Sequence, residues 1–109
     1  MNDLLKQKCQ PLEGGSAMST ADITARLEDA PGWSFTNGAI EKTFNFKNYL
    51  ETIAFVNALA WICNTHDHHP DLAVSYSRCV VRFNTHSVGG ISINDFICAA
   101  QANELVALV

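Results

Sequence analysis

The sequence predicts one α+β domain, in which a four-stranded antiparallel sheet carries helices on one face, in the order α-β-β-α-β-β-α. Three observations support this class. An Asn-Gly pair stands between two strand-like runs, a long apolar helix follows them, and a capping motif precedes the last helix. The 109 residues leave no length for a second domain of ordinary size. We expect residues 1–18 to form a leader or arm and residues 19–109 to form the folded domain.

The first half of the domain is predicted to be a short helix followed by a hairpin. Ser19 is a suitable N-cap for the helix, which ends before the Pro-Gly pair at 31–32. The Asn-Gly pair at 37–38 is the strongest short-range hairpin signal, and it joins residues 33–35 to residues 39–46.

A long helix is predicted over roughly residues 49–64, with Asn48 as its N-cap. Between residues 54 and 63 only Asn57 is polar, so the helix is apolar nearly all the way round. Such a helix has to be covered on two sides, and in a small domain a second subunit is a natural second cover. We therefore expect a homodimer or homotetramer; a core helix under a long loop is the alternative.

The second half of the domain is predicted to be another strand pair and a final helix. Residues 73–76 and 79–85 have the residue types of strands and are joined by a tight turn. Ser92 and Asp95 form an S-x-x-D capping box, which opens a helix through about Glu104.

Charge and composition exclude several classes of protein. Seven basic and eleven acidic residues give a net charge of −4, and no Lys/Arg run is present, which argues against nucleic-acid binding. The longest apolar run, residues 58–63, is too short to span a bilayer, and the first residues lack a signal-peptide pattern. We expect a cytoplasmic protein without a membrane partner, whose cysteines are thiols rather than disulfides. These cysteines are Cys9, Cys63, Cys79 and Cys98.

Three of the four histidines lie close together, between residues 65 and 71. Histidine has an unperturbed pKa of about 6.5, so it can give and take protons near neutrality. Pro70 pushes His69 toward an extended backbone. If His68 is extended too, the rings of His68 and His69 leave the backbone in roughly opposite directions. His86, at the end of the last predicted strand, is a natural third member of a site with His68 and His69. The cluster indicates acid–base catalysis or metal binding.

A metal site is the chemical alternative to acid–base work. None of the familiar zinc patterns is present, and adjacent histidines that diverge from an extended backbone rarely chelate one ion. We therefore expect no metal, and we interpret His66 by itself as a polar loop residue. The side chains that could otherwise supply ligands are those of Cys63, His66, Asp67, His68 and His69.

Several motifs occur together in a specific order and spacing. They are Asp67-His68-His69-Pro70-Asp71-Leu72, Tyr76, Thr85-His86, Gly89-Gly90-Ile91-Ser92 and Asp95-Phe96. Further matches lie upstream, at Cys9 to Gly15, Phe44 to Tyr49, and Ala54-Phe55-Val56. In these residues, over nearly its whole length, the chain resembles the pterin-4a-carbinolamine dehydratases, also called 4a-hydroxytetrahydrobiopterin dehydratases, and in particular the bacterial members.

The resemblance implies a hydro-lyase. The family removes water from 4a-hydroxytetrahydropterin, the carbinolamine left by aromatic amino-acid hydroxylases, and gives the quinonoid dihydropterin in tetrahydropterin recycling. By position, His68 and His86 are implied to be the acid–base residues, and His69 to be a catalytic residue that holds the substrate. Pro70, which shapes the loop, and Asp95 are implied to complete the substrate site. A pterin is the implied partner, an aromatic amino-acid hydroxylase the implied functional link, and no cofactor is implied.

Two positions depart from the family pattern, and two other functions stay open. Asn64 stands where many members have a carboxylate, and Leu12 stands where related bacterial chains often have a second cysteine. Animal members also act as dimerisation cofactors for a homeodomain transcription factor, and the apolar helix at residues 54–63 would suit such an interaction module. A metal-binding protein built on the histidine cluster is the third hypothesis.

Overall fold

The computed structural model describes residues 3–12 and 15–107 of the chain. Residues 1–2, 13–14 and 108–109, which include part of the predicted arm, lie outside this description. The described helices are α1 (Thr20–Arg26), α2 (Tyr49–His66) and α3 (Ile93–Ala107). The described strands are β1 (Ser34–Thr36), β2 (Ala39–Asn45), β3 (Asp71–Val74) and β4 (Arg78–Phe83). Short 3-10 turns are η1 (Leu4–Lys6), η2 (Leu27–Asp29) and η3 (His86–Val88).

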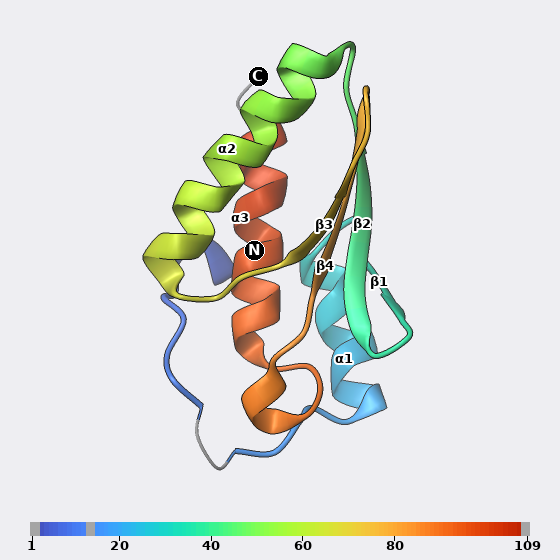
Figure 1. Ribbon diagram of the computed structural model, residues 1–109. Helices are drawn as coiled ribbons and strands as arrows, with labels where there is room; N and C mark the ends of the chain where they lie inside the picture. The colour runs from blue at the N-terminus through green and yellow to red at the C-terminus, as the bar shows by residue number, and fades with distance from the viewer. Residues whose placement is uncertain (1–2, 13–14, 108–109) are drawn as a thin grey trace.

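The strands form one antiparallel sheet in the order β1-β2-β4-β3, and α2 and α3 lie against one face of it (Figure 1). The predicted α+β class and the order of its elements are therefore confirmed. The core lies between the sheet and these helices, and residues 94–100 of α3 are all buried there. Among the described residues, no helix combines the length and the apolar character needed to cross a membrane.

The hairpin forms at the predicted place. Thr36 pairs with Ala39, so that Asn37 and Gly38 are the two turn residues between β1 and β2. Both turn residues have positive φ, 50° and 79°, as a type I′ turn requires. The turn fixes the register, in which Ile40 and Phe44 of β2 are buried toward the helices.

Helix α2 begins as predicted, because the Asn48 side chain accepts a hydrogen bond from the Glu51 amide at 2.9 Å. It runs to His66, two residues beyond the predicted end, so His66 is a helical residue and not a loop residue. One face of the helix is buried against the core and the opposite face is open, with Leu50 and Trp61 each 78% exposed. The buried face consists of Thr52, Phe55, Leu59 and Cys63.

The second strand pair is present, but its predicted bounds were wrong. The strand predicted over residues 73–76 is β3 at 71–74, because residues 75–77 form the turn, in which the Ser75 amide donates to the Arg78 carbonyl at 2.8 Å. Pairing therefore runs from Asp71 to Val74. Strand β4 ends at residue 83, two residues before the predicted end. Thr85 leaves the ladder and forms an isolated bridge with Gly90, which closes the loop in front of α3.

Candidate active site

The end of α2 determines where His68 lies. Asp67 adopts the left-handed conformation, with φ of 52°, and terminates the helix. The His68 amide then donates to the Cys63 carbonyl at 3.0 Å, an arrangement typical of helix C-caps. The imidazole of His68 is nearly parallel to the ring of Phe83 at the end of β4, with 5.8 Å between centroids and 13° between planes.

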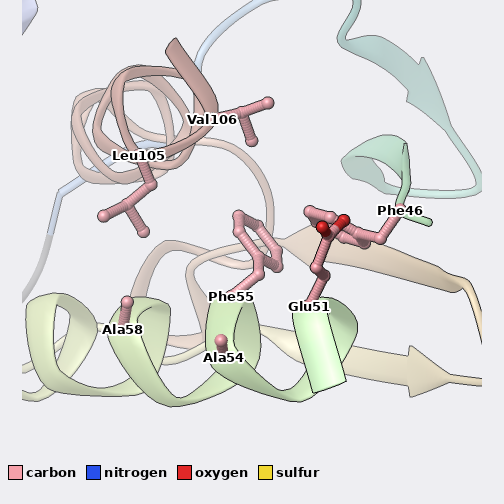
Figure 2. Close-up of a pocket in the computed structure, with 7 residues that line it drawn as sticks. All are labelled: Phe46, Glu51, Ala54, Phe55, Ala58, Leu105 and Val106. Atoms are coloured by element: carbon pink, nitrogen blue, oxygen red, sulfur yellow. The ribbon is translucent and has the colours of Figure 1, made fainter. Parts of the chain in front are cut away.

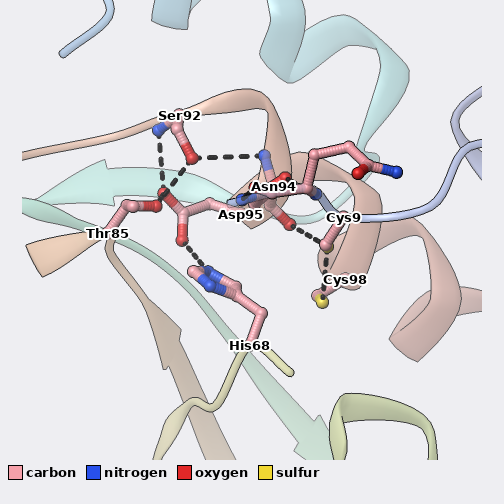
Figure 3. Close-up of polar contacts among 8 residues, drawn as sticks. Cys9, His68, Thr85, Ser92, Asn94, Asp95 and Cys98 are labelled. Carbon is pink, nitrogen blue, oxygen red and sulfur yellow. Dashed lines mark hydrogen bonds and ion pairs between the residues drawn. The ribbon is translucent and has the colours of Figure 1, made fainter. Parts of the chain in front are cut away.

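Asp95, at the start of α3, is the polar partner of His68. One carboxylate oxygen, Oδ1, lies 2.5 Å from His68 Nε2, and the Asp95 side chain is fully buried. The other oxygen, Oδ2, accepts hydrogen bonds from the Thr85 hydroxyl at 2.8 Å and from the Ser92 amide at 2.9 Å. Figure 3 shows these contacts converging on the carboxylate from the end of β4, the loop before α3 and the loop after α2.

The S-x-x-D motif forms half of the predicted capping box. Asp95 accepts from the Ser92 amide as predicted, whereas the Ser92 hydroxyl accepts from the Asn94 amide at 3.2 Å rather than from that of Asp95. The Ser92 hydroxyl also lies 2.7 Å from that of Thr85. Asp95 thus has two functions at once, because the carboxylate that caps α3 also pairs with His68.

The surroundings of His68 favour its protonated form. Burial of the ring lowers its pKa, but the hydrogen bond to Asp95 and the charge of that carboxylate outweigh burial and raise the pKa above 6.5. Smaller contributions in the same direction come from Cys9 and Asp67. His68 can therefore supply a proton at neutral pH, and the buried carboxylate beside it stabilises the positive charge.

The other predicted site residues lie further toward the surface. His69 and His86 are exposed, and Pro70 is half-buried. Among the described residues, no hydrogen bond or ion pair links His69 or His86 to His68 or Asp95. The structure therefore brings His68 and Asp95 together, while the roles of His69, Pro70 and His86 stay predictions.

His66 has a structural partner that the sequence did not indicate. Its Nδ1 accepts a hydrogen bond from the Cys9 amide at 3.1 Å, so the end of α2 holds the N-terminal segment. Burial, the charge of Lys8 and the charge of His68 lower the pKa of His66, which keeps this ring neutral and able to accept. No local sequence pattern links positions 9 and 66.

A cavity of about 430 Å³ opens beside His68. Its volume is in the range of roughly 300–1,000 Å³ that small-molecule sites occupy. The N-terminal segment from Lys8 to Leu12 forms one side of it, and the end of α2, Thr85, Ser87 and Asn94 form the rest. Within residues 3–12 and 15–107, no three or more His, Cys, Asp or Glu side chains are grouped so as to hold a metal ion.

A second cavity, of about 550 Å³, lies between α2 and the C-terminal end of α3. Figure 2 shows Leu105 and Val106 on α3 facing Ala54, Phe55 and Ala58 on α2. Its lining is apolar apart from Glu51, and it holds no histidine. The smaller cavity is therefore the candidate active site, because it is lined by His68, the partner of the buried Asp95. His69, Pro70 and His86 are not among its lining residues.

The fold and the buried carboxylate–histidine pair define a candidate acid–base site, and comparison with known proteins identifies the family. Residues 16–105 match the model of the pterin 4 alpha carbinolamine dehydratase family. A protein from Nitrosospira multiformis is 46% identical over 106 residues, which are 96% of this chain and 94% of that protein. One from Stenotrophomonas maltophilia is 51% identical over 105 residues, or 94% and 90%. Both are assigned, by name, as pterin-4-alpha-carbinolamine dehydratases.

A solved structure agrees with the sequence relatives. The crystal structure of a transcriptional coactivator/pterin dehydratase from Brucella melitensis is similar with a TM-score of 0.79 and 26% sequence identity. The similarity covers 83% of this chain and 98% of that one. The chain therefore belongs to the pterin-4-alpha-carbinolamine dehydratase family, as the sequence motifs predicted.

Proposed function

We propose that this chain removes water from a 4a-hydroxytetrahydropterin and releases the quinonoid dihydropterin, as a step in tetrahydropterin recycling. Membership of the family supports the class of substrate and of reaction. The observation that carries the mechanism is the pairing of His68 with the buried carboxylate of Asp95 at the wall of a cavity of suitable size.

The reaction needs a proton at one atom and the removal of a proton from another. In a carbinolamine, the C–O bond breaks as the hydroxyl group leaves, and the neighbouring ring nitrogen loses its proton to form the C=N bond. The hydroxyl is a poor leaving group unless it is protonated, so a positioned acid accelerates the step. Protonated His68 gives its proton to the departing oxygen, water leaves, and the proton lost from nitrogen restores the balance.

The remaining residues are assigned around this proton donor. His86 is proposed as the second acid–base residue, which accepts or relays the ring proton, and His69 as the residue that holds the pterin. Pro70 orients the loop that carries His69. Asp95 is fully buried with both oxygens engaged, so we assign it to positioning and charging His68.

We further propose that the chain is a homodimer or homotetramer through the open face of α2. Leu50 and Trp61 on this face are large apolar side chains and each is 78% exposed, so a second copy of the chain docked here would bury apolar surface. The alternative is that a different protein binds this face. The Brucella melitensis neighbour is described as a transcriptional coactivator as well as a pterin dehydratase, which supports this alternative. The proposed substrate also implies a functional link to an aromatic amino-acid hydroxylase in the cytoplasm.

Turnover tests the proposed function directly. Freshly generated 4a-hydroxytetrahydropterin is mixed with the purified chain, and dehydration is followed by ultraviolet absorbance. We expect a rate well above that in buffer, and a large loss of rate in a His68→Ala/His86→Ala double variant. A rate equal to the buffer rate, or one that the double variant leaves unchanged, contradicts the proposal.

A further inference from the structure

The N-terminal segment contributes to the candidate active site although it lies outside the part that matches the family model. That match begins at residue 16, whereas residues 8–12 line the cavity beside His68. These five residues, the part of the predicted leader that lines the cavity, are called the arm from here on. Their contacts show that they are not loosely placed.

Asn94 holds the arm through a pair of hydrogen bonds. Its Oδ1 accepts from the Gln10 amide at 3.2 Å, and its Nδ2 donates to the Gln10 carbonyl at 2.8 Å. The pair resembles one rung of a β-ladder, with a side-chain amide in place of a strand. Asn94 is only 6% exposed and directly precedes Asp95 on α3, so the arm is fixed to the same turn of helix as the carboxylate that pairs with His68.

Cys9 gives the arm two further anchors. Its amide donates to His66 Nδ1 at 3.1 Å, and its buried thiol lies 3.5 Å from the Asn94 carbonyl oxygen and 3.7 Å from Cys98 Sγ. Upstream, Leu4 is fully buried in the core. The wall formed by residues 8–12 is thus preorganised, which lowers the conformational cost of binding a ligand against it.

We propose that the arm is a specificity-determining wall of the pterin site, positioned by Asn94, and that Pro11 and Leu12 contact the edge of the bound pterin remote from the reacting carbon. This inference rests on the proposed function, because the ligand is taken to be the pterin. Contacts remote from the reacting atoms hold ground state and transition state alike, so their loss raises KM more than it lowers kcat. We expect His68 and Asp95 to keep their places when the arm is altered, because the hydrogen bonds of Asp95 with His68, Thr85 and Ser92 do not involve residues 8–12.

Two variants test the wall in opposite ways. Asn94→Ala removes both hydrogen bonds to Gln10 and loosens the wall, whereas Leu12→Trp keeps the arm anchored and fills the space beside it. Asn103→Ala is the control, since Asn103 is another asparagine on α3 and its side chain bonds only groups away from the cavity. It donates to the Pro31 carbonyl and accepts from Trp33 and Lys42. Each variant is assayed for kcat and KM and titrated with a 7,8-dihydropterin by calorimetry.

We expect KM and the dissociation constant to rise about five- to tenfold in Asn94→Ala and Leu12→Trp, with a smaller change in kcat and an unchanged pH profile. Asn103→Ala is expected to keep the wild-type KM. If both test variants keep the wild-type KM and dissociation constant while turnover is normal, the wall is refuted and the proposed function stands. If turnover is absent but the variants weaken dihydropterin binding, the proposed function fails and the wall stands. Absence of both turnover and binding refutes both.

Discussion

His68 Nε2 lies 2.5 Å from Asp95 Oδ1, although 27 residues separate the two in the sequence. The contact joins an imidazole nitrogen to a carboxylate, as in a charge-assisted hydrogen bond, and the carboxylate has no contact with solvent. The pair sits where the end of α2, the end of β4 and the start of α3 meet (Figure 3). The protonation of His68 is therefore set by a residue from a different element of the fold.

The Asp95→Asn substitution is expected to shift the pH dependence of catalysis. The new amide side chain would keep an acceptor for the Ser92 amide but carry no negative charge, so His68 would lose the two largest contributions that raise its pKa, and its pKa would fall. The acidic form of His68 would then persist only at lower pH. We expect kcat at neutral pH to fall by about 10²-fold or more, as for loss of a general acid. An NMR titration of His68 that matches the wild type would contradict this.

The stability of the fold is expected to depend on pH through His68. Its pKa is raised in the folded state, so proton binding favours folding. This contribution is fully present below about pH 6.5, the unfolded value, and is lost as the pH rises through the folded-state pKa. In urea denaturation, the deficit of His68→Gln relative to the wild type is expected to be larger at about pH 5.5 than at about pH 8.5. An equal deficit at both pH values is the contrary result.

The Thr85 hydroxyl is expected to stabilise the carboxylate. Thr85→Val keeps the shape but removes the donor to Asp95 and the contact with Ser92. We expect a loss of about 1–3 kcal/mol in the free energy of unfolding, since a buried charged group loses one of its partners. Thr43→Val, at an exposed site on β2, is the control and is expected to change it by less than about 0.5 kcal/mol. Equal effects of the two variants would show that the hydroxyl has no special role.

Cys9 is expected to be the first of the four cysteines to react with iodoacetamide. The hydrogen bond with Cys98 lowers the pKa of Cys9, whereas the contacts of Cys98 with Cys63 and Cys9 raise the pKa of Cys98, and burial raises that of Cys79. The thiolate is the reactive form, and Cys9 also lines the cavity. Peptide mapping after brief alkylation gives the order in which the four cysteines react. Earlier labelling of Cys63, Cys79 or Cys98 would refute it.

The open face of α2 is expected to be an interface between copies of the chain. Trp61→Glu places a charge at a side chain that is 78% exposed in the single chain, so the fold is retained while an interface there is lost. Sedimentation equilibrium is expected to show a dimer or tetramer for the wild type and a monomer for the variant. A monomeric wild type would leave the face free for a different protein and would contradict self-association.

The features that the sequence predicted well depend on residues close together in the chain. The Asn37-Gly38 turn, the Asn48 cap and the pairing of Ser92 with Asp95 each join residues at most three positions apart. Backbone preferences and side-chain reach decide such contacts before any tertiary structure forms. The position of His68 after the helix was likewise accessible through the His-His-Pro motif.

The contacts that the sequence did not reveal depend on how distant elements dock. The approach of His68 to Asp95 and the clamp of Asn94 on Gln10 need the completed packing of α2 and α3. His66 looked like a polar loop residue because its partner, the Cys9 amide, lies 57 residues away and has no side-chain signature. The end of β4 was predicted too late for a related reason. Thr85 does not pair within the sheet but forms a bridge with Gly90 and donates a hydrogen bond to Asp95.

Because three segments converge on Asp95, the proposed proton donor depends on the folded chain and not on the His-His-Pro motif alone. A peptide with that motif, or a chain in which α3 has not yet docked, has a solvated imidazole of ordinary acidity. The raised pKa of His68 arises only once the carboxylate is buried against it. A chain in which α3 has not docked therefore lacks the raised pKa of His68, and we expect it not to catalyse the proposed dehydration.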